Sequence, residues 1–338
     1  AIADDAFVLT GSTRTGDLET QAQVLAAYLA EPGWRPEAFQ RLKTASKTIH
    51  DQYEATASGV LSRDLPGLLH DGDKRWAFPS RSAIADAKLE DLKDVVAPEM
   101  AAGPVEVVIV GDVSVEAAVD AVASTFGALP ARPAPAPLPA AQRQTAFPGP
   151  NAKPVVLKHK GRADQALGFI AWRTTDFFAD PQKARDTAVM GEVMNLRLID
   201  ELREAQGATY SPQVTYNHSM TWPGYGFVSA SVEIPPDKLD AFYADVRKIA
   251  ADLVAKPPSA DELARAKTPR LDRIEKARVT NQYWLAELSG GQADPRRLDA
   301  IRAAVSGTER VGPADVQRAA ALYLREDKAW RLEVLPEK

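Results

Sequence analysis

The sequence predicts an α+β protein of two homologous α/β-sandwich domains, each a mixed sheet with helices packed on one face, with the first domain truncated at its N-terminus. Two observations favour this fold. A shift of 224 positions brings similar residues together over roughly 90 positions without any insertion, so that Lys43 meets Lys267 and Val108 meets Leu332. Within each repeat, a few short strand patterns accompany several longer helical ones. A repeat this long indicates two copies of one domain instead of a solenoid.

The repeat also predicts where the domains begin and end. The second copy begins near Lys153, and Ala1 corresponds to Tyr225, so the first copy lacks about 72 residues at its start. Because the chain also lacks an initiator Met, we interpret it as a piece of a longer protein or as a processed product. The predicted organisation is a first domain at 1–132, a proline-rich linker at 133–153, and a second, complete domain at 154–338.

Helices are predicted where apolar residues recur every three or four positions. Pro36 suits the first turn of a helix, where its missing amide is not needed. Ser259 and Glu262 have the spacing of a capping box, in which each side chain bonds the other residue's backbone amide. The predicted helices cover 18–29, 36–57, 61–70, the region of 89–95, 115–126, 180–205, 237–255, a stretch from 259 to beyond 284, 296–305 and 313–324.

Strands are predicted in short β-branched or alternating runs. The run at 105–110 lies between Gly103-Pro104 and Gly111, so we expect a buried strand there. Residues 130–154 contain eight prolines and predict an extended linker. The predicted strands are a remnant at 6–10, then 105–110, 154–159, 165–173, 208–217, 225–234 and 330–335.

Composition excludes several classes of function. The chain has 45% hydrophobic and 26% charged residues and a net charge of −5, with no basic cluster, so neither nucleic acid nor a membrane is an expected partner. The absence of cysteine excludes disulfides, thiolate metal sites and cysteine nucleophiles.

The histidines do not have the spacing of a zinc site. None of His50, His70, His159 and His218 lies three or four residues from another, so no helix face presents two imidazoles to one metal ion. The run from His70 to Asp73 lacks the further ligands of a calcium loop and is expected to be a solvated turn. We therefore predict no metal ligand and no cofactor-binding residue in this chain.

Two segments resemble a known family. In the first, Gly-Asp-Val at 111–113 follows a predicted strand and Phe-Gly-Ala-Leu-Pro at 126–130 follows the next helix. In the second, Leu-Arg-Glu at 202–204 precedes Tyr-Ser at 210–211, with Arg203 and Tyr210 seven residues apart. Together they resemble the pitrilysin/insulinase family of zinc metallopeptidases over essentially the whole chain, including the helix start at 259–263 and Lys267.

The resemblance implies a place in a larger assembly. Members of this family have four homologous domains in one chain, or paired two-domain subunits, whose halves close around a chamber. The zinc half carries a His-x-x-Glu-His helix and a downstream glutamate ligand. This chain resembles the other, C-terminal half, which lacks the zinc motif; the alternative is a zinc half from which the motif is missing. The expected position of the third ligand is Thr48 to His50, and no carboxylate lies between Glu37 and Asp51, which favours the half without zinc.

The resemblance also implies catalytic roles for Arg203 and Tyr210. A guanidinium offers fixed donors to a peptide carbonyl, and a phenol can donate to the oxyanion of a tetrahedral intermediate. The alternative is purely structural: an arginine at a helix end, where its charge complements the helix dipole, and a half-buried strand tyrosine.

We therefore expect the substrate-enclosing half of a zinc-dependent endopeptidase. Zinc would come from the complementary half, either fused upstream or a separate subunit, and the substrate would be a peptide. The chain alone would be inactive. The alternative is a non-catalytic structural or docking subunit of the same family. Composition does not give the compartment, although a periplasmic location is favoured over a cytoplasmic one.

Overall fold

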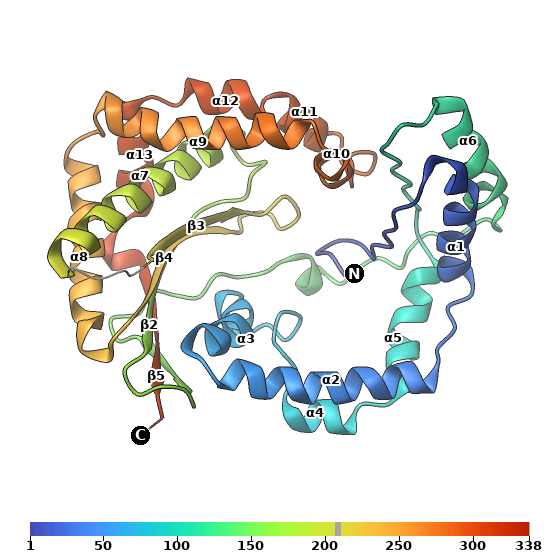
Figure 1. Cartoon of the computed structure of the whole chain (residues 1–338), viewed down its shortest axis with the longest axis horizontal. Coiled ribbons are helices and arrows are strands. Elements are labelled where there is room, and N and C mark those ends of the chain that lie inside the picture. The colour runs from blue at the N-terminus through green and yellow to red at the C-terminus, as the bar shows by residue number, and fades with distance from the viewer. Residues whose placement is uncertain (207–210, 338) are drawn as a thin grey trace. The chain divides into compact units, whose positions relative to one another are not determined.

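The computed structural model describes residues 1–206 and 211–337, with backbone alone for 203–206. The described residues form both helices and strands, and the strands come together in one sheet, as the α+β prediction requires (Figure 1). The helices are α1 (Leu18–Ala30), α2 (Pro36–Glu54), α3 (Ala57–Leu69), α4 (Arg81–Asp86), α5 (Leu89–Ala101), α6 (Val115–Ser124), α7 (Pro181–Gln206), α8 (Leu239–Ala255), α9 (Ala260–Arg278), α10 (Asn281–Leu288), α11 (Arg296–Arg302), α12 (Ala304–Arg310) and α13 (Pro313–Tyr323). The strands are β1 (Val155–His159), β2 (Ala166–Arg173), β3 (Gln213–His218), β4 (Gly226–Ile234) and β5 (Ala329–Pro336).

The five strands form one mixed sheet in the order β1-β5-β2-β4-β3. Strands β1 and β5 run parallel, with Leu157 opposite Val334, while the other neighbours run antiparallel. Strand β2 lies at the centre and is buried on both faces, which is why its sequence is apolar without alternation.

One face of the sheet is covered by α7, α8 and α13, as the sequence predicts. Alternate residues of β2, such as Ile170 and Trp172, point to this side and are at most 1% exposed. They meet Met194 of α7 and Phe242 of α8, both fully buried. This is the larger of the two hydrophobic cores.

The opposite face is covered by α3, which comes from the first half of the chain. Ala57 and Val60 of α3 are fully buried against residues from β2 and β5 such as Phe169 and Leu332. The Tyr225 hydroxyl donates to the carbonyl of Leu69 at 3.1 Å and fastens the end of the helix. The sequence did not predict this second helical layer, because nothing local to α3 identifies its partner.

The chain divides into two compact units, and each takes a segment from the other half of the sequence. The predicted domain boundaries at 132/133 and 153/154 follow the repeat instead of compactness, and they stay a prediction. The segment 48–79 joins the second unit, and the segment 275–301 joins the first; the two correspond at the 224-residue offset to within three residues. The first unit comprises 1–47, 80–139 and 275–301, and the second comprises 48–79, 140–274 and 302–338.

The helical part of the repeat is present in detail. Helices α2 and α9 have 19 residues each and begin 224 positions apart. The ammonium group of Lys43 donates to the carbonyls of Ala85 and Ala87 at 2.7 and 2.9 Å. That of Lys267 donates to the carbonyls of Glu309 and Val311 at 2.6 and 2.9 Å, each residue shifted by 224 positions. The two copies therefore share the same pair of hydrogen bonds from a lysine to two backbone carbonyls.

The strand predictions for the first copy are wrong. Residues 105–110 form no strand, and residues 6–10 contribute only an isolated bridge between Ile2 and Phe7. The reason is the lack of partners: in the second copy β5 pairs with β1 and β2, whose counterparts at the same offset would precede residue 1. The helix predicted to continue past Trp284 is interrupted after Arg278, where Thr280 caps α10.

Among the described residues, no helix combines the length and the apolar character needed to cross a bilayer.

Candidate functional site

The predicted catalytic residues, Arg203 and Tyr210, stand in the sequence at the end of α7 and before β3. The backbone of Arg203 belongs to the last turn of α7. The side chain of Arg203, and all of Tyr210, lie outside the described residues. What the structure does give is the framework on either side of this segment.

The helix side of the framework is anchored in the larger core. Leu198 and Leu202 of α7 are at most 1% exposed. Glu201, one turn before the helix end, accepts a hydrogen bond from the ammonium group of Lys248 on α8 at 2.8 Å. These contacts fix the rotation of α7 up to the residue before Arg203.

The strand side is anchored by two sets of hydrogen bonds. Strand β3 pairs with β4, with Gln213 opposite Ser231. The amide of Val214 donates to Oδ1 of Asn195 on α7 at 3.1 Å, and Gly191 leaves room for the ring of Tyr216. Strand and helix therefore run in opposite directions, and the end of α7 and the start of β3 lie at the same end of the pair.

A polar cluster that the sequence did not predict lies beside this framework. The Tyr216 hydroxyl is 3.4 Å from Oε1 of Glu192 and accepts a hydrogen bond from the guanidinium of Arg270 on α9. Burial raises the pKa of Tyr216, so the phenol stays protonated. The three residues come from α7, β3 and α9, at separations of 24 and 54 positions, and no local motif links them.

The described residues do not fit a zinc site. They contain no group of three or more histidine, aspartate or glutamate side chains that could hold a metal ion. His50 and His70 donate to the carbonyls of Pro79 and Pro66. His159 uses both ring nitrogens, accepting from the amide of Gly161 and donating to the carbonyl of Gln165. Each ring is thus held by backbone groups, and no step of zinc chemistry is assigned to this chain.

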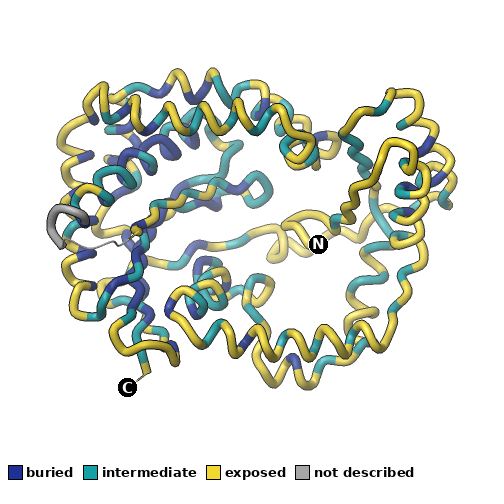
Figure 2. The backbone as a smooth tube through the Cα atoms, in the orientation of Figure 1, coloured by how far each residue is buried: buried dark blue, intermediate teal, exposed yellow. Residues whose placement is uncertain are grey.

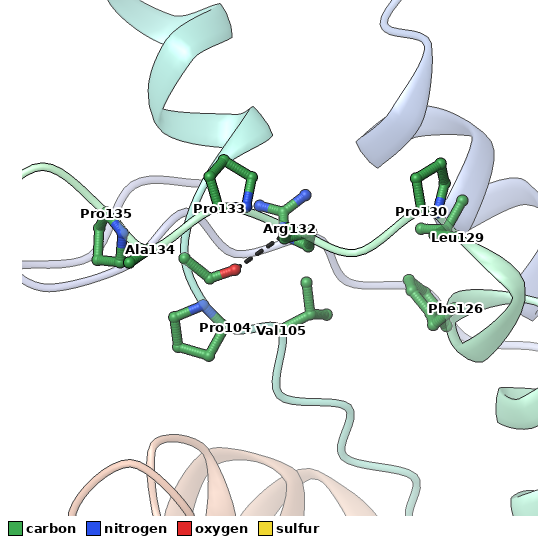
Figure 3. Close-up of a pocket in the computed structure, with 10 residues that line it drawn as sticks. Pro104, Val105, Phe126, Leu129, Pro130, Arg132, Pro133, Ala134 and Pro135 are labelled. Atoms are coloured by element: carbon green, nitrogen blue, oxygen red, sulfur yellow. Dashed lines mark hydrogen bonds between the residues drawn. The ribbon is translucent and has the colours of Figure 1, made fainter.

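A pocket among the described residues lies away from Arg203 and Tyr210 in the sequence. It has a volume of about 540 Å³, belongs to the first unit, and is lined mostly by proline and other apolar side chains (Figure 3). Arg132 is its polar member, and its guanidinium donates to the carbonyls of Met100, Ala102 and Gly103 at the end of α5. The guanidinium of Arg132 thus serves to hold the end of α5, and the rest of the pocket lining is apolar.

Comparison with known proteins gives one family match. Residues 86–269 match the family model described as the peptidase M16 inactive domain. The chain is 23% identical over 365 residues to the chloroplastic stromal processing peptidase of Arabidopsis thaliana, an alignment that covers 90% of this chain and 28% of that protein. The chain therefore spans well under a third of the length of this relative.

Two solved structures have the same fold. The peptidase M16 inactive domain from Pseudomonas fluorescens superposes with a TM-score of 0.75 at 20% identity, covering 95% of this chain and 76% of that chain. The periplasmic protease PqqL from Escherichia coli superposes with a TM-score of 0.75 at 15% identity, covering 96% of this chain and 35% of that chain. At identities this low, the likeness concerns the fold alone.

Proposed function

Because the chain belongs to the peptidase M16 family, whose inactive domain its residues 86–269 match, we propose that it forms the substrate-enclosing half of a zinc-dependent endopeptidase. The resemblance to the C-terminal half without the zinc motif is confirmed by this match. The complementary half, fused upstream or separate, would supply zinc, which activates the attacking water as a Lewis acid when bound.

The observation that carries the proposal is the framework around the Arg203–Tyr210 segment. The hydrogen bond from the Val214 amide to Oδ1 of Asn195 sets the alignment of β3 and α7. In the sequence, Arg203 and Tyr210 stand between these two anchors. In the proposal these two side chains converge on one bound peptide.

The two residues would do different work. Arg203 would hold a carbonyl of the bound peptide through paired donors, which favours substrate capture. Tyr210 would donate its hydroxyl to the oxyanion that forms when water adds to the scissile carbonyl. Both groups act on charge or dipoles of the peptide itself, so the expected substrate is a peptide or unfolded polypeptide. We also propose a periplasmic location; PqqL of Escherichia coli, which shares the fold, is a periplasmic protease.

The deciding experiment is steady-state kinetics of Tyr210→Phe in the enzyme reconstituted with its zinc half. The substitution removes one hydroxyl and almost no volume, so kcat should fall on the order of 10²–10³ while KM changes little. Arg203→Ala should also raise KM, because a guanidinium binds the ground state. Tyr28→Phe, at an exposed position on α1, is the matched control and should be silent.

Unchanged turnover in a Tyr210→Phe enzyme with an unaltered melting curve would overturn the catalytic assignment. The second candidate, a non-catalytic docking subunit, would then account for the chain, as the word "inactive" in the family description allows.

A further inference from the structure

A segment within the predicted linker lies on the second unit with few bonds of its own. Residues 140–147, which we call the strap, begin with a short helical turn, and residues 140–144 are all exposed, as the yellow colour in Figure 2 shows. The strap belongs to no strand, and among the described residues no backbone hydrogen bond outside that turn joins it to another segment. Its position therefore depends on side chains.

Arg75, in the turn after α3, supplies the hydrogen bonds that hold the strap. Its guanidinium donates to the carbonyls of Gln142 and Gln144, both at 2.7 Å. The two terminal nitrogens of one planar fork thus bind one short stretch of the strap, on either side of Arg143. All of these residues belong to the second unit.

The guanidinium of Arg75 is itself held in place by three side chains. The carboxylate of Asp73 accepts its hydrogen bonds at 2.6 to 3.1 Å, and these bonds lower the pKa of Asp73, so the carboxylate keeps its charge. The rings of Trp76 and Trp222 lie 4.6 and 4.9 Å from Cζ of Arg75, in cation–π contact. Because Trp222 comes from the loop between β3 and β4, Arg75 joins the strap both to the end of α3 and to this hairpin.

The far end of the strap is held by one aromatic side chain. Phe147 is 7% exposed and belongs to the smaller core, where its ring centre lies 6.1 Å from that of Phe227 on β4. Two residues earlier, Oγ1 of Thr145 is buried with no hydrogen-bond partner among the described residues. Water would satisfy this hydroxyl if the strap lifted, so the closed position has a cost that Arg75 and Phe147 offset.

We propose that the strap opens and closes over the aromatic side of the smaller core, and that Arg75 is the latch that keeps it closed. Opening breaks the two hydrogen bonds from Arg75 and withdraws Phe147, which uncovers the ring of Phe227. The sheet stays intact, because none of its ladders includes the strap. The device is independent of peptidase chemistry: it exposes or covers an apolar surface without unfolding the second unit.

The test uses the absence of cysteine, because one introduced thiol is then the only thiol in the chain. Thr145→Cys places the thiol in the strap, at a buried side-chain atom, and Val232→Cys places it in the larger core, at a position on β4 that is 2% exposed. The rate at which a thiol-reactive dye labels each folded protein measures how often that site opens. The thiol of Thr145→Cys should react faster than that of Val232→Cys, because the strap opens without the sheet.

Variants of Arg75 make the test specific for the latch. Arg75→Met should speed the labelling of Thr145→Cys on the order of 10- to 100-fold and leave that of Val232→Cys unchanged. Arg75→Lys keeps the charge but lacks the planar fork, and should give an intermediate rate. Lys74→Met, at the exposed neighbouring position, is the matched control and should change neither rate.

Two results would overturn the proposal. If Arg75→Met labels Thr145→Cys no faster than Lys74→Met does, water replaces the guanidinium at no cost and Arg75 is not a latch. If the thiol of Val232→Cys reacts as fast as that of Thr145→Cys, or accelerates with it in Arg75→Met, the opening is unfolding of the whole unit and the strap does not move by itself.

Discussion

His218 is a half-buried titratable side chain at the end of β3, the opposite end of the strand from Gln213. Its Nδ1 donates to the carbonyl of Thr175 at 3.0 Å, and its Nε2 is buried with no hydrogen-bond partner among the described residues. Burial lowers the pKa of His218, assisted by Arg270 and opposed by the Thr175 carbonyl and Asp176. The imidazole is thus held neutral in the folded protein.

We predict that His218 makes the folded state sensitive to mild acid. Its folded pKa lies below its unfolded value of about 6.5, so the stability it contributes is present above that pH and is lost as the pH falls through the folded pKa. His218→Asn keeps a donor for Thr175 but does not titrate. Melting temperatures between pH 7.5 and 5 should fall more steeply for the natural chain than for the variant; equal slopes would contradict the prediction.

The isolated chain should neither retain zinc nor cleave peptides. The physical reason is that its histidines are bonded to backbone groups and are not clustered within the described residues. Metal analysis of the purified chain, beside a peptide-cleavage assay, checks both statements. One tightly bound zinc ion per molecule would show that they are wrong.

At the residue scale, the sequence decides only what a local spacing can decide. The spacing of the histidines is enough to exclude a paired zinc motif, because two ligands on one helix must be three or four residues apart. The contact of Tyr216 with Glu192 and Arg270 could not be predicted, since it depends on how α7, β3 and α9 pack together. The assignment of Arg203 and Tyr210 stays a prediction.

At the scale of elements, two lysines close equivalent loops in the two copies. Lys267 on α9 binds the carbonyls of Glu309 and Val311, which precede α13. A charged donor shared by two carbonyls holds the entry to that helix in place, and α13 packs on both α7 and α8. The lysine therefore links α9 to the layer that covers the sheet.

Lys267→Met should lower the free energy of unfolding by about 1.5–3 kcal/mol, because it leaves two carbonyls without their charged donor while keeping the aliphatic stem. Lys276→Met, at an exposed position on the same helix, is the control and should stay within about 0.5 kcal/mol. Chemical denaturation of both variants measures the difference. A loss no larger than that of the control would show that water replaces the lysine at no cost.

The sequence predicted β1, β2, β4 and β5 to within one residue, but it also predicted strands in the first copy that the structure does not have. The first residues of α1, α2, α5 and α13 follow from local spacing and start signals, since a helix makes its hydrogen bonds within itself. A strand makes them with another segment. The run at 105–110 is as β-branched as β5, but only β5 has neighbours to bond. β-propensity alone therefore predicted a strand in both places and was right in one.

At the scale of the whole molecule, the five-stranded sheet depends on a helix from the first half of the chain. Helix α3 buries Val60 and Leu69 against Phe169, Leu332 and Val334. Without it, one face of β2 and β5 would be open to water. Contiguous domains at 1–132 and 154–338 would not supply this cover.

We therefore expect the fragment 154–338, expressed alone, to expose this apolar face, bind a hydrophobic dye and associate. The fragment lacks α3, and burial of a Phe or Leu side chain contributes about 1.5–3 kcal/mol. Dye fluorescence and sedimentation, compared with the full chain, provide the measurement. A monomeric, dye-silent fragment with a sharp thermal transition would contradict this expectation.

The same crossing of α3 sets a condition on synthesis. A ribosome releases Val60 long before it makes Leu332, the residue against which that valine packs, and at about 5–20 residues per second the delay is on the order of 15–55 s. Helices form in microseconds, so α3 is complete while its apolar side still has nothing to cover. Nascent chains must pass through this interval on every round of translation. The apolar side of α3 is therefore open to solvent until the strands that it covers have been synthesised.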